Sequence, residues 1–312
     1  MVMFDTLTAR DNFWSANKSC GRKYIAACWQ HRGVLSQLPV AAGAVVGVLL
    51  FGTSHRGRSL AQTFRLSAMM VRGKGFNDRQ QRQLGREKLL FLLAWVCNVT
   101  IFMVSTFYDV GLSTPSLGSA IHCLCLSMQS AVILCLTFSI GYVCRTLTLV
   151  VDLFCCDVLD TFRLPEVPHA WNVTQAVLRK ASSSIELCLV TLCVTLAFAI
   201  PLLLVDVQAF GGKMRTMLIL LPGFIITCGV FYVLLLAALV SEKCARVPAL
   251  INALSFGPGT DRTRQHTVDY IVSSAAGFYV FGMRLTTAMV LKFMYTWSII
   301  AIGLVTRLVS LD

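Results

Sequence analysis

Charged residues are scarce in this chain. Asp, Glu, Lys and Arg account for 13% of its 312 residues, whereas an ordinary soluble domain contains about 25%. Hydrophobic residues account for 56% of the sequence, and the mean hydropathy is +0.71. A composition so poor in charge argues against a soluble globular domain and indicates an integral membrane protein.

The sequence also lacks the motifs of common enzymes and metal sites. No Cys-x-x-Cys pair occurs, so nothing supports a structural zinc site. There is no His-Glu-x-x-His motif, no nucleophile elbow and no pair of carboxylates within an apolar segment. Most of the 13 cysteines lie inside apolar runs, where a thiol behaves as a small hydrophobic side chain. We therefore predict that the protein is not an enzyme and binds neither a metal nor another cofactor.

Long apolar segments are what the chain does contain. A bilayer core about 30 Å thick requires roughly 20 helical residues. Five long segments carry no charge, and a sixth contains only Lys292. The six segments are 34–52, 89–108, 110–144, 187–205, 216–240 and 285–306. The sequence therefore predicts an all-α, polytopic helical membrane protein with about six spans.

Two segments depart from a simple span. In 110–144, Pro115 and Gly118 predict a turn, so we expect the span to begin near Ser119. Apolar residues continue beyond Arg145, which predicts a helix that extends well into the cytosol. Residues 261–276 grade from polar to apolar and are too short to cross a bilayer. They predict a cytosolic or interfacial helix, followed by a break near 277–282 and then the final span.

The basic residues set the expected orientation. Loops 53–88, 145–186 and 241–284 hold 18 Lys and Arg, and the segments on the opposite side hold eight. The side with more positive charge should be cytosolic, so both termini are expected outside. Basic residues between apolar blocks indicate contact with the lipid bilayer, and no groove-reading module supports a nucleic-acid partner.

This orientation identifies two candidate modification sites. Asn17 begins an Asn-Lys-Ser triplet that would face outside, so it is a candidate for N-glycosylation. Cys155 and Cys156 follow a span on the cytosolic side and are candidates for palmitoylation. The alternative for these two cysteines is that they stay unmodified.

The C-terminal segment resembles a known family. Residues 276–287 read Ala-Gly-Phe-Tyr-Val-Phe-Gly-Met-Arg-Leu-Thr-Thr and lead into an apolar helix with Thr296-Trp297 near its middle. This stretch resembles the C-terminus of insect-type gustatory and odorant receptors, which end in Thr-Tyr, five apolar residues and Gln-Phe. Trp297 replaces the usual Tyr, and Gly303 and Leu304 stand where Gln-Phe is expected. The family has seven spans, so this chain looks like a divergent or N-terminally short member.

The resemblance implies a chemosensory, gustatory-type receptor that acts as a ligand-gated, non-selective cation channel in sensory perception of taste. It would be a multi-pass plasma-membrane protein and a homo- or hetero-tetramer that responds to a small-molecule ligand. Residues 1–33 would be a short N-terminal region, 34–260 the ligand-sensing membrane helices, and 261–312 the pre-pore and pore helices.

The resemblance also implies two sets of site residues. The pore would be lined by Thr296, Ser298, Ile299, Ile300, Ile302 and Gly303. The ligand would contact Ser105, Phe107, Tyr108, His122, Met128, Met217 and Phe224 in the outer halves of other helices. The alternatives are that the two pore hydroxyls bond back to their own helix and that the other residues are ordinary packing and interfacial side chains. Lys292 would either snorkel to the internal headgroups or face a wet vestibule.

Two other functions fit a polytopic protein. A G-protein-coupled receptor would carry an Asp-Arg-Tyr-like triplet where this chain has Gly141 to Arg145, and an Asn-Pro-x-x-Tyr motif that is missing. A secondary transporter would show internal repeats and broken helices, but no repeat is found, and Pro201 and Pro222 are the only prolines in the later spans. Both are kept as alternatives.

Overall fold

The fold is built almost entirely from α-helices, as expected. The computed structural model describes residues 37–52, 77–110, 117–161, 164–210, 213–254 and 261–309. Within these ranges the helices are α3 (Gln37–Gly52), α5 (Asn77–Val110), α6 (Leu117–Thr161), α7 (Val167–Phe210), α8 (Lys213–Ala253), α9 (Asp261–Ser274) and α10 (Thr287–Val309). A short 3₁₀ turn, η1 (Leu164–Glu166), joins α6 to α7, and a hairpin of β1 (Tyr279–Val280) and β2 (Met283–Arg284) joins α9 to α10. The N-terminal region 1–33 lies outside the described residues.

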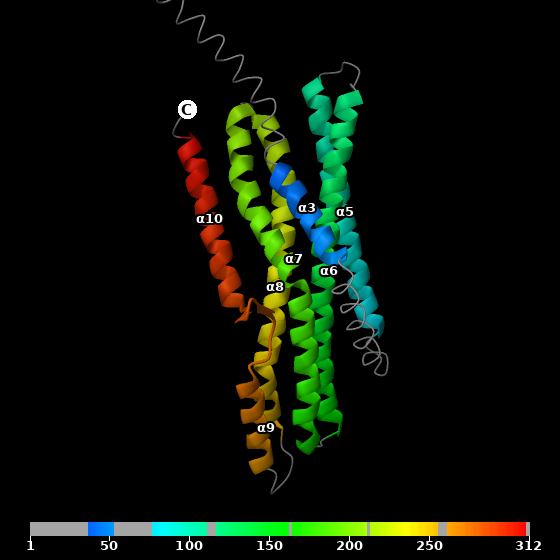
Figure 1. The fold of residues 1–312 in the computed structure, drawn as a ribbon, viewed down its shortest axis with the longest axis vertical. Coiled ribbons are helices and arrows are strands. Elements are labelled where there is room, and N and C mark those ends of the chain that lie inside the picture. The colour runs from blue at the N-terminus through cyan, green and yellow to red at the C-terminus, as the bar shows by residue number, and fades with distance from the viewer. Residues whose placement is uncertain are drawn as a thin grey trace, which may run out of the picture.

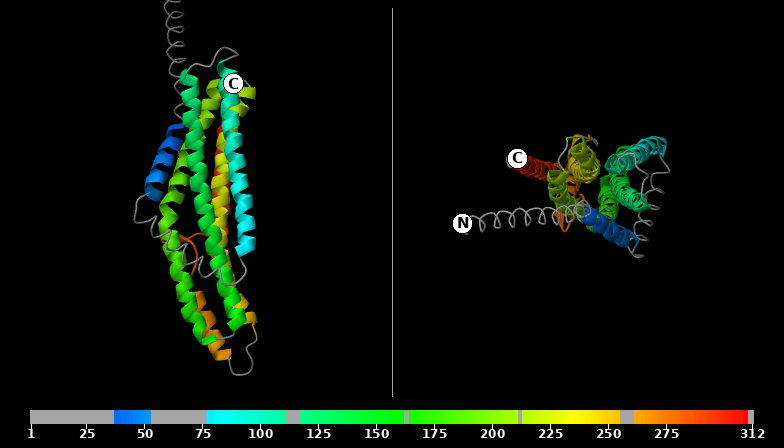
Figure 2. Two further views of the ribbon diagram at one scale, coloured as in Figure 1. Left: turned by 90° about the vertical axis from the view of Figure 1, so that its right-hand side faces the viewer. Right: turned by 90° about the horizontal axis from the view of Figure 1, so that it is seen from above.

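Three helices run the length of the molecule (Figure 1). α6, α7 and α8 contain 45, 44 and 41 residues. At a rise of 1.5 Å per residue each is roughly 60–70 Å long, about twice the thickness of a bilayer core. Figures 1 and 2 show α3, α5 and α10 beside one half of these helices and α9 beside the other half. We call the first half the membrane half. The second half, the stalk, consists of α9 and residues 146–161, 167–186 and 241–253.

Within the described ranges, four helices are long and apolar enough to cross a membrane, as expected for a multi-pass membrane protein. Their apolar parts are Gly85–Val104, Cys123–Asp160, Val167–Leu203 and Leu220–Ala253. Two shorter apolar helices, Gln37–Leu50 and Thr287–Gly303, accompany them. The turn predicted near Pro115 falls between the end of α5 at Val110 and the start of α6 at Leu117, outside the described residues.

The stalk is only partly anticipated by the sequence. The predicted extension of the third apolar segment is confirmed, since α6 continues without interruption to Thr161. α7 and α8 also extend into the stalk, from Val167 and to Ala253, which we did not predict. The sequence predicts loops for these residues because charged side chains interrupt the apolar pattern there.

The hydrophobic core of the membrane half continues into the stalk. Trp171 of α7 is buried against Phe154 of α6, with 4.9 Å between ring centroids. Leu178 and Ile185 of α7 and Ile251 of α8 are buried in the same cluster. Such burial identifies the stalk as a helical bundle stabilised by apolar packing.

α3 approaches its neighbours through glycines. A Cβ at Gly43 would lie 2.0 Å from Thr195 Oγ1 of α7, and one at Gly47 would lie 2.3 Å from Leu136 Cδ1 of α6. Small residues allow close approach of helices in membranes, where apolar area alone does not drive association. α3 is therefore fitted to α6 and α7 in the membrane half.

Candidate functional site

The junction between α9 and α10 begins where α7 binds the end of α9. Ala275 follows α9 with a φ of 47°, the left-handed conformation that commonly terminates a helix. Trp171 Nε1 donates a hydrogen bond to Ser274 Oγ at 2.7 Å, and Gln175 Nε2 donates one to the Ser274 carbonyl at 2.8 Å. α7 thus fixes the point at which α9 stops, three residues before the break predicted near 277–282.

A tight hairpin then reverses the chain. β1 and β2 pair antiparallel, and the two residues between them, Phe281 and Gly282, have φ values of 48° and 76°. A type I′ turn requires positive φ at both central residues, which favours glycine. The Leu285 amide donates to the Phe278 carbonyl at 2.9 Å and extends the pairing by one rung. The Gly-Phe-Tyr-Val-Phe-Gly-Met-Arg sequence therefore forms a compact, hydrogen-bonded connector.

Ser241 of α8 holds the base of this hairpin. The Phe278 amide donates to Ser241 Oγ at 2.9 Å, and Arg284 Nη2 donates to the Ser241 carbonyl at 2.7 Å. The Phe278 side chain is completely buried. A Cβ at Gly277 would lie 2.7 Å from Arg284 Nε and 3.0 Å from Ser241 Oγ, so a side chain there would displace one of them. The junction is thus fixed to the point where the membrane half of α8 passes into the stalk.

α10 starts from this anchored connector. Thr286 Oγ1 accepts a hydrogen bond from the Met289 amide at 3.4 Å, as an N-cap residue does. Val290 is buried, and Phe293 packs edge-on against Phe231 of α8 with 6.2 Å between centroids. From there α10 separates from α8 and continues on the outside of the bundle beside α7 (Figure 1). Only one face of α10 near its N-terminus joins the bundle.

The six predicted pore residues are all exposed on α10, but they do not share one face. Thr296, Ile299, Ile300 and Gly303 are spaced i, i+3, i+4 and i+7, so they form one stripe. Ser298 and Ile302 lie on a second stripe, each about 160° from Ile300 at 100° per residue, and Ile302, three residues after Ile299, borders the first stripe. The exposed Lys292 lies four residues before Thr296 and so shares its stripe. These six residues therefore cannot all face one axis.

The two hydroxyls make the backbone bonds expected of the alternative interpretation. Thr296 Oγ1 donates to the Lys292 carbonyl and Ser298 Oγ donates to the Met294 carbonyl, both at 2.9 Å. Each hydroxyl oxygen keeps a lone pair that can accept a further hydrogen bond. These bonds are compatible with either role.

The predicted ligand residues are spread over three helices, in their parts that belong to the membrane half. Ser105, Phe107 and Tyr108 lie on α5, His122 on α6 and Met217 on α8. The side chains of these five residues lie outside the described part. Met128 of α6 and Phe224 of α8 are described, and both are exposed. Neither lines a cavity of about 430 Å³ between α5 and α6 or one of about 320 Å³ in the stalk.

Of the three candidate modification sites, the structure describes Cys155 and Cys156 but not Asn17. Cys155 and Cys156 are half-buried on the stalk part of α6, ten residues and so about 15 Å beyond Arg145. Cys155 also packs against the hydrophobic core. Asn17 lies outside the described residues, and both modifications stay predictions.

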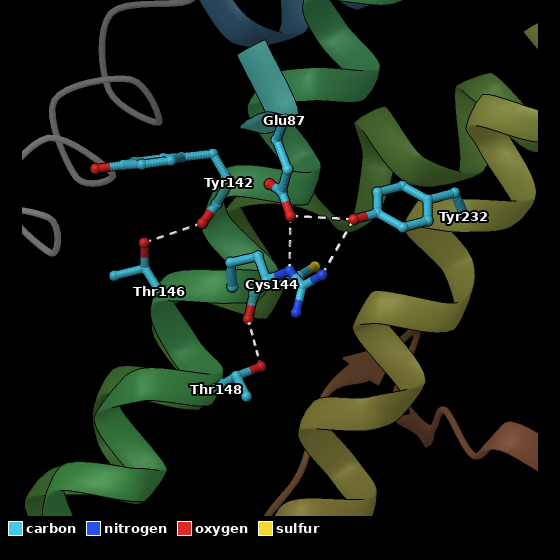
Figure 3. Close-up of polar contacts among 7 residues, drawn as sticks. Glu87, Tyr142, Cys144, Thr146, Thr148 and Tyr232 are labelled. Atoms are coloured by element: carbon cyan, nitrogen blue, oxygen red, sulfur yellow. Dashed lines mark hydrogen bonds and ion pairs between the residues drawn. The ribbon is translucent and has the colours of Figure 1, made fainter. Parts of the chain in front are cut away.

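A polar cluster that we did not predict joins three helices where the membrane half meets the stalk (Figure 3). Arg145 Nε of α6 lies 2.9 Å from Glu87 Oε1 of α5. Arg145 Nη2 donates to the Tyr232 hydroxyl of α8 at 3.1 Å, and that hydroxyl donates to Glu87 Oε1 at 3.0 Å. The Glu87 side chain is only 11% exposed, and that of Arg145 is 39% exposed. One signal was available, because Glu87 is the only acidic residue within the last ten residues of a strongly basic loop.

Comparison with known proteins adds no relative. No protein-family model matches the chain, and no curated protein matches it. The fold defines an all-α protein whose described part includes four helices long and apolar enough to cross a membrane. The interpretation of its function depends on its own residues.

Proposed function

We propose that the protein is a gustatory-type chemosensory receptor of the plasma membrane, a cation channel gated by a small-molecule ligand. In this proposal α3 and α10 cross the bilayer together with the four longer apolar helices, giving six spans. The single observation that carries the proposal is the position of α10. This apolar helix starts from an anchored hairpin and then runs along the outside of the bundle, away from α8.

The exposed side of α10 supports association of several copies around a central axis. Ile299, Ile300 and Ile302 are exposed there, and Leu291 and Tyr295 add to this surface. A helix that contacts its own bundle along one face has a second face free for symmetric neighbours. A homo- or hetero-tetramer, as in the family that the C-terminal stretch resembles, would surround the axis with four copies of α10.

Of the two stripes on α10, we assign the one with Thr296, Ile299, Ile300 and Gly303 to the pore. Gly303 stands where the resembled family carries a pore-facing amide, and Ile300 lies on the same stripe one turn before it. A ring of isoleucines can close a pore by excluding water, and ligand binding would widen it. The small-molecule ligand would bind in the outer part of the membrane half, near Met128 and Phe224.

Continuous helices favour a channel over the transporter alternative. Pro201 lies inside α7 and Pro222 inside α8, and both helices continue through them. Transporters of the inverted-repeat type use helices broken near the middle of the membrane. The described part of the chain has a comparable break between α9 and α10, where the β1–β2 hairpin separates the two helices. That break lies at the edge of the membrane half and not in its middle.

The test is cysteine substitution on the two stripes of α10, with currents recorded from cells exposed to a panel of uncharged small organic molecules. Ile300→Cys and Gly303→Cys are expected to be blocked by a cationic thiol reagent during ligand-evoked current. Ser298→Cys and Ile302→Cys, on the other stripe, are the matched controls and should react with little effect on current. Block at the control positions alone would reassign the pore face, and ligand-driven substrate flux without current would favour a transporter.

Shortening the proposed constriction provides a second test. Ile300→Ala removes apolar volume from the ring, so the closed state should lose stability relative to the open state. A shift of about 1.4 kcal/mol would raise current without ligand about tenfold. Ile302→Ala is the control, and equal effects of both substitutions would contradict the assignment.

A further inference from the structure

An apolar groove runs along the outside of the bundle between α5 and α6. It has a volume of about 430 Å³. Its wall on α5 is formed by Lys88, Phe91 and Trp95, and its wall on α6 includes Leu134, Cys135 and Phe138. Leu89, Leu90 and Leu93 beside it are exposed, as lipid-facing side chains are. The groove is therefore open to the hydrocarbon of a bilayer.

The floor of the groove offers no free polar group to a polar ligand. Phe91 and Phe138 pack edge to face at 5.4 Å between centroids. Trp95 Nε1 donates to the Ser127 carbonyl at 3.3 Å, and Ser139 Oγ donates to the Cys135 carbonyl at 2.8 Å. With these donors already bonded, the walls present hydrocarbon and aromatic carbon. An alkyl chain is the ligand that such walls accommodate.

One end of the groove carries a positive charge. Glu87 is turned to Arg145 inside the bundle, and Lys88, the next residue, lines the groove and is exposed. None of the described residues that line the groove is acidic. The apolar span of α5 starts at Gly85, so Lys88 lies in its first turn. Trp95 lies seven residues further, about 10 Å deeper in the bilayer.

We propose that this groove binds one anionic phospholipid, with its phosphate at Lys88 and an acyl chain against Phe91, Trp95 and Leu134. The assignment to an anionic phospholipid depends on the order of the charged and apolar groups along the groove. The cation is placed at headgroup depth and the apolar walls at hydrocarbon depth, as an amphiphile with a negative head requires. The proposal does not depend on channel activity.

The test uses the fluorescence of Trp95 in purified full-length protein reconstituted into bilayers. Brominated phosphatidylglycerol and brominated phosphatidylcholine quench a tryptophan when their acyl chains contact it. The Trp95 signal is the difference between the protein and its Trp95→Phe variant. A basic residue near an anionic surface contributes about 1 kcal/mol, so the anionic lipid should associate about fivefold more tightly than the zwitterionic one.

Three substitutions at basic residues separate a site from general surface charge. Lys88→Gln should bring the ratio of the two association constants close to one, and Lys88→Arg should keep it. Arg86→Gln is the matched control, because Arg86 is also exposed, lies two residues away and does not line the groove. An equal effect of Arg86→Gln and Lys88→Gln would overturn the proposal, and so would equal quenching by both lipids in the parent protein.

A further substitution tests the acyl-chain half of the groove. Cys135→Trp fills the groove from the α6 side. The fluorescence of the new tryptophan is measured in the Cys135→Trp, Trp95→Phe double variant and subtracted from that of Cys135→Trp, which leaves the Trp95 signal. It should weaken quenching of Trp95 by both lipids while leaving quenching of distant tryptophans unchanged. If this variant does not fold, the lysine series alone decides. Absence of Trp95 quenching in parent protein that crosslinks to a second copy through α5 would assign the groove to a protein contact instead.

Discussion

Replacing Arg145 with methionine is expected to lower the free energy of unfolding by about 3 kcal/mol. The substitution leaves the carboxylate of Glu87 inside the bundle without a cation, and removal of one partner of a buried ion pair costs about 3–5 kcal/mol. The lower end applies because the Arg145 side chain is 39% exposed and because the Tyr232 hydroxyl still donates to Glu87. We expect the loss to appear as a lower midpoint in detergent-mediated unfolding.

A second ion pair in the same protein is the control. Lys243 Nζ lies 2.5 Å from Asp152 Oδ2 between α8 and α6, but these side chains are 37% and 35% exposed. Exposed pairs contribute about 0–1 kcal/mol, so Lys243→Met should cost less than 1 kcal/mol. In a double-mutant cycle, Glu87→Gln with Arg145→Met should cost less than the sum of the single changes. Equal costs for Arg145→Met and Lys243→Met would contradict a buried, coupled cluster.

The membrane helices could be predicted because their signal is local. A run of about 20 uncharged apolar residues has few structural solutions in a chain so poor in charge. The extension of α6 and the break between α9 and α10 followed from single features, namely the apolar residues up to Phe154 and the glycines at 277 and 282. α7 and α8 in the stalk were missed because Arg179 and Lys180 face outwards while Leu178 and Ile185 are buried. A window that searches for uniform hydropathy overlooks such an amphipathic helix.

The polar contacts could not be predicted because they join residues far apart in the chain. Arg145 meets Glu87 across 58 positions and Tyr232 across 87. Ser241 meets Phe278 across 37 positions. Which side chains meet depends on the rotation and register of whole helices, which an apolar pattern leaves undetermined. The C-terminal motif was recognisable as a string, but its role as an anchor for α10 depends on Ser241, which no motif identified.

The hairpin offers an internal comparison between two phenylalanines. Phe278 and Phe281 lie three residues apart, yet Phe278 is completely buried and Phe281 is 60% exposed. Truncation of a buried phenylalanine to alanine costs about 3–5 kcal/mol through lost transfer energy and the cavity left behind. Surface substitutions usually change stability by less than about 0.5 kcal/mol. The two sites therefore differ in expected effect by several kilocalories within one short connector.

Phe278→Ala is accordingly expected to destabilise the protein by about 4 kcal/mol and to release α10 from its anchored start. The cavity would form beside Ser241, so the bonds from the Phe278 amide and from Arg284 to that residue should weaken together. Phe281→Ala should leave both stability and any ligand-evoked current unchanged, because it keeps the turn conformation and removes an exposed ring. Unfolding midpoints of the two variants, with currents recorded at equal surface expression, give the measurement. Equal loss of current in the two variants would assign the effect on current to the turn and not to the buried Phe278 ring. Equal destabilisation by the two substitutions would contradict the packing described here.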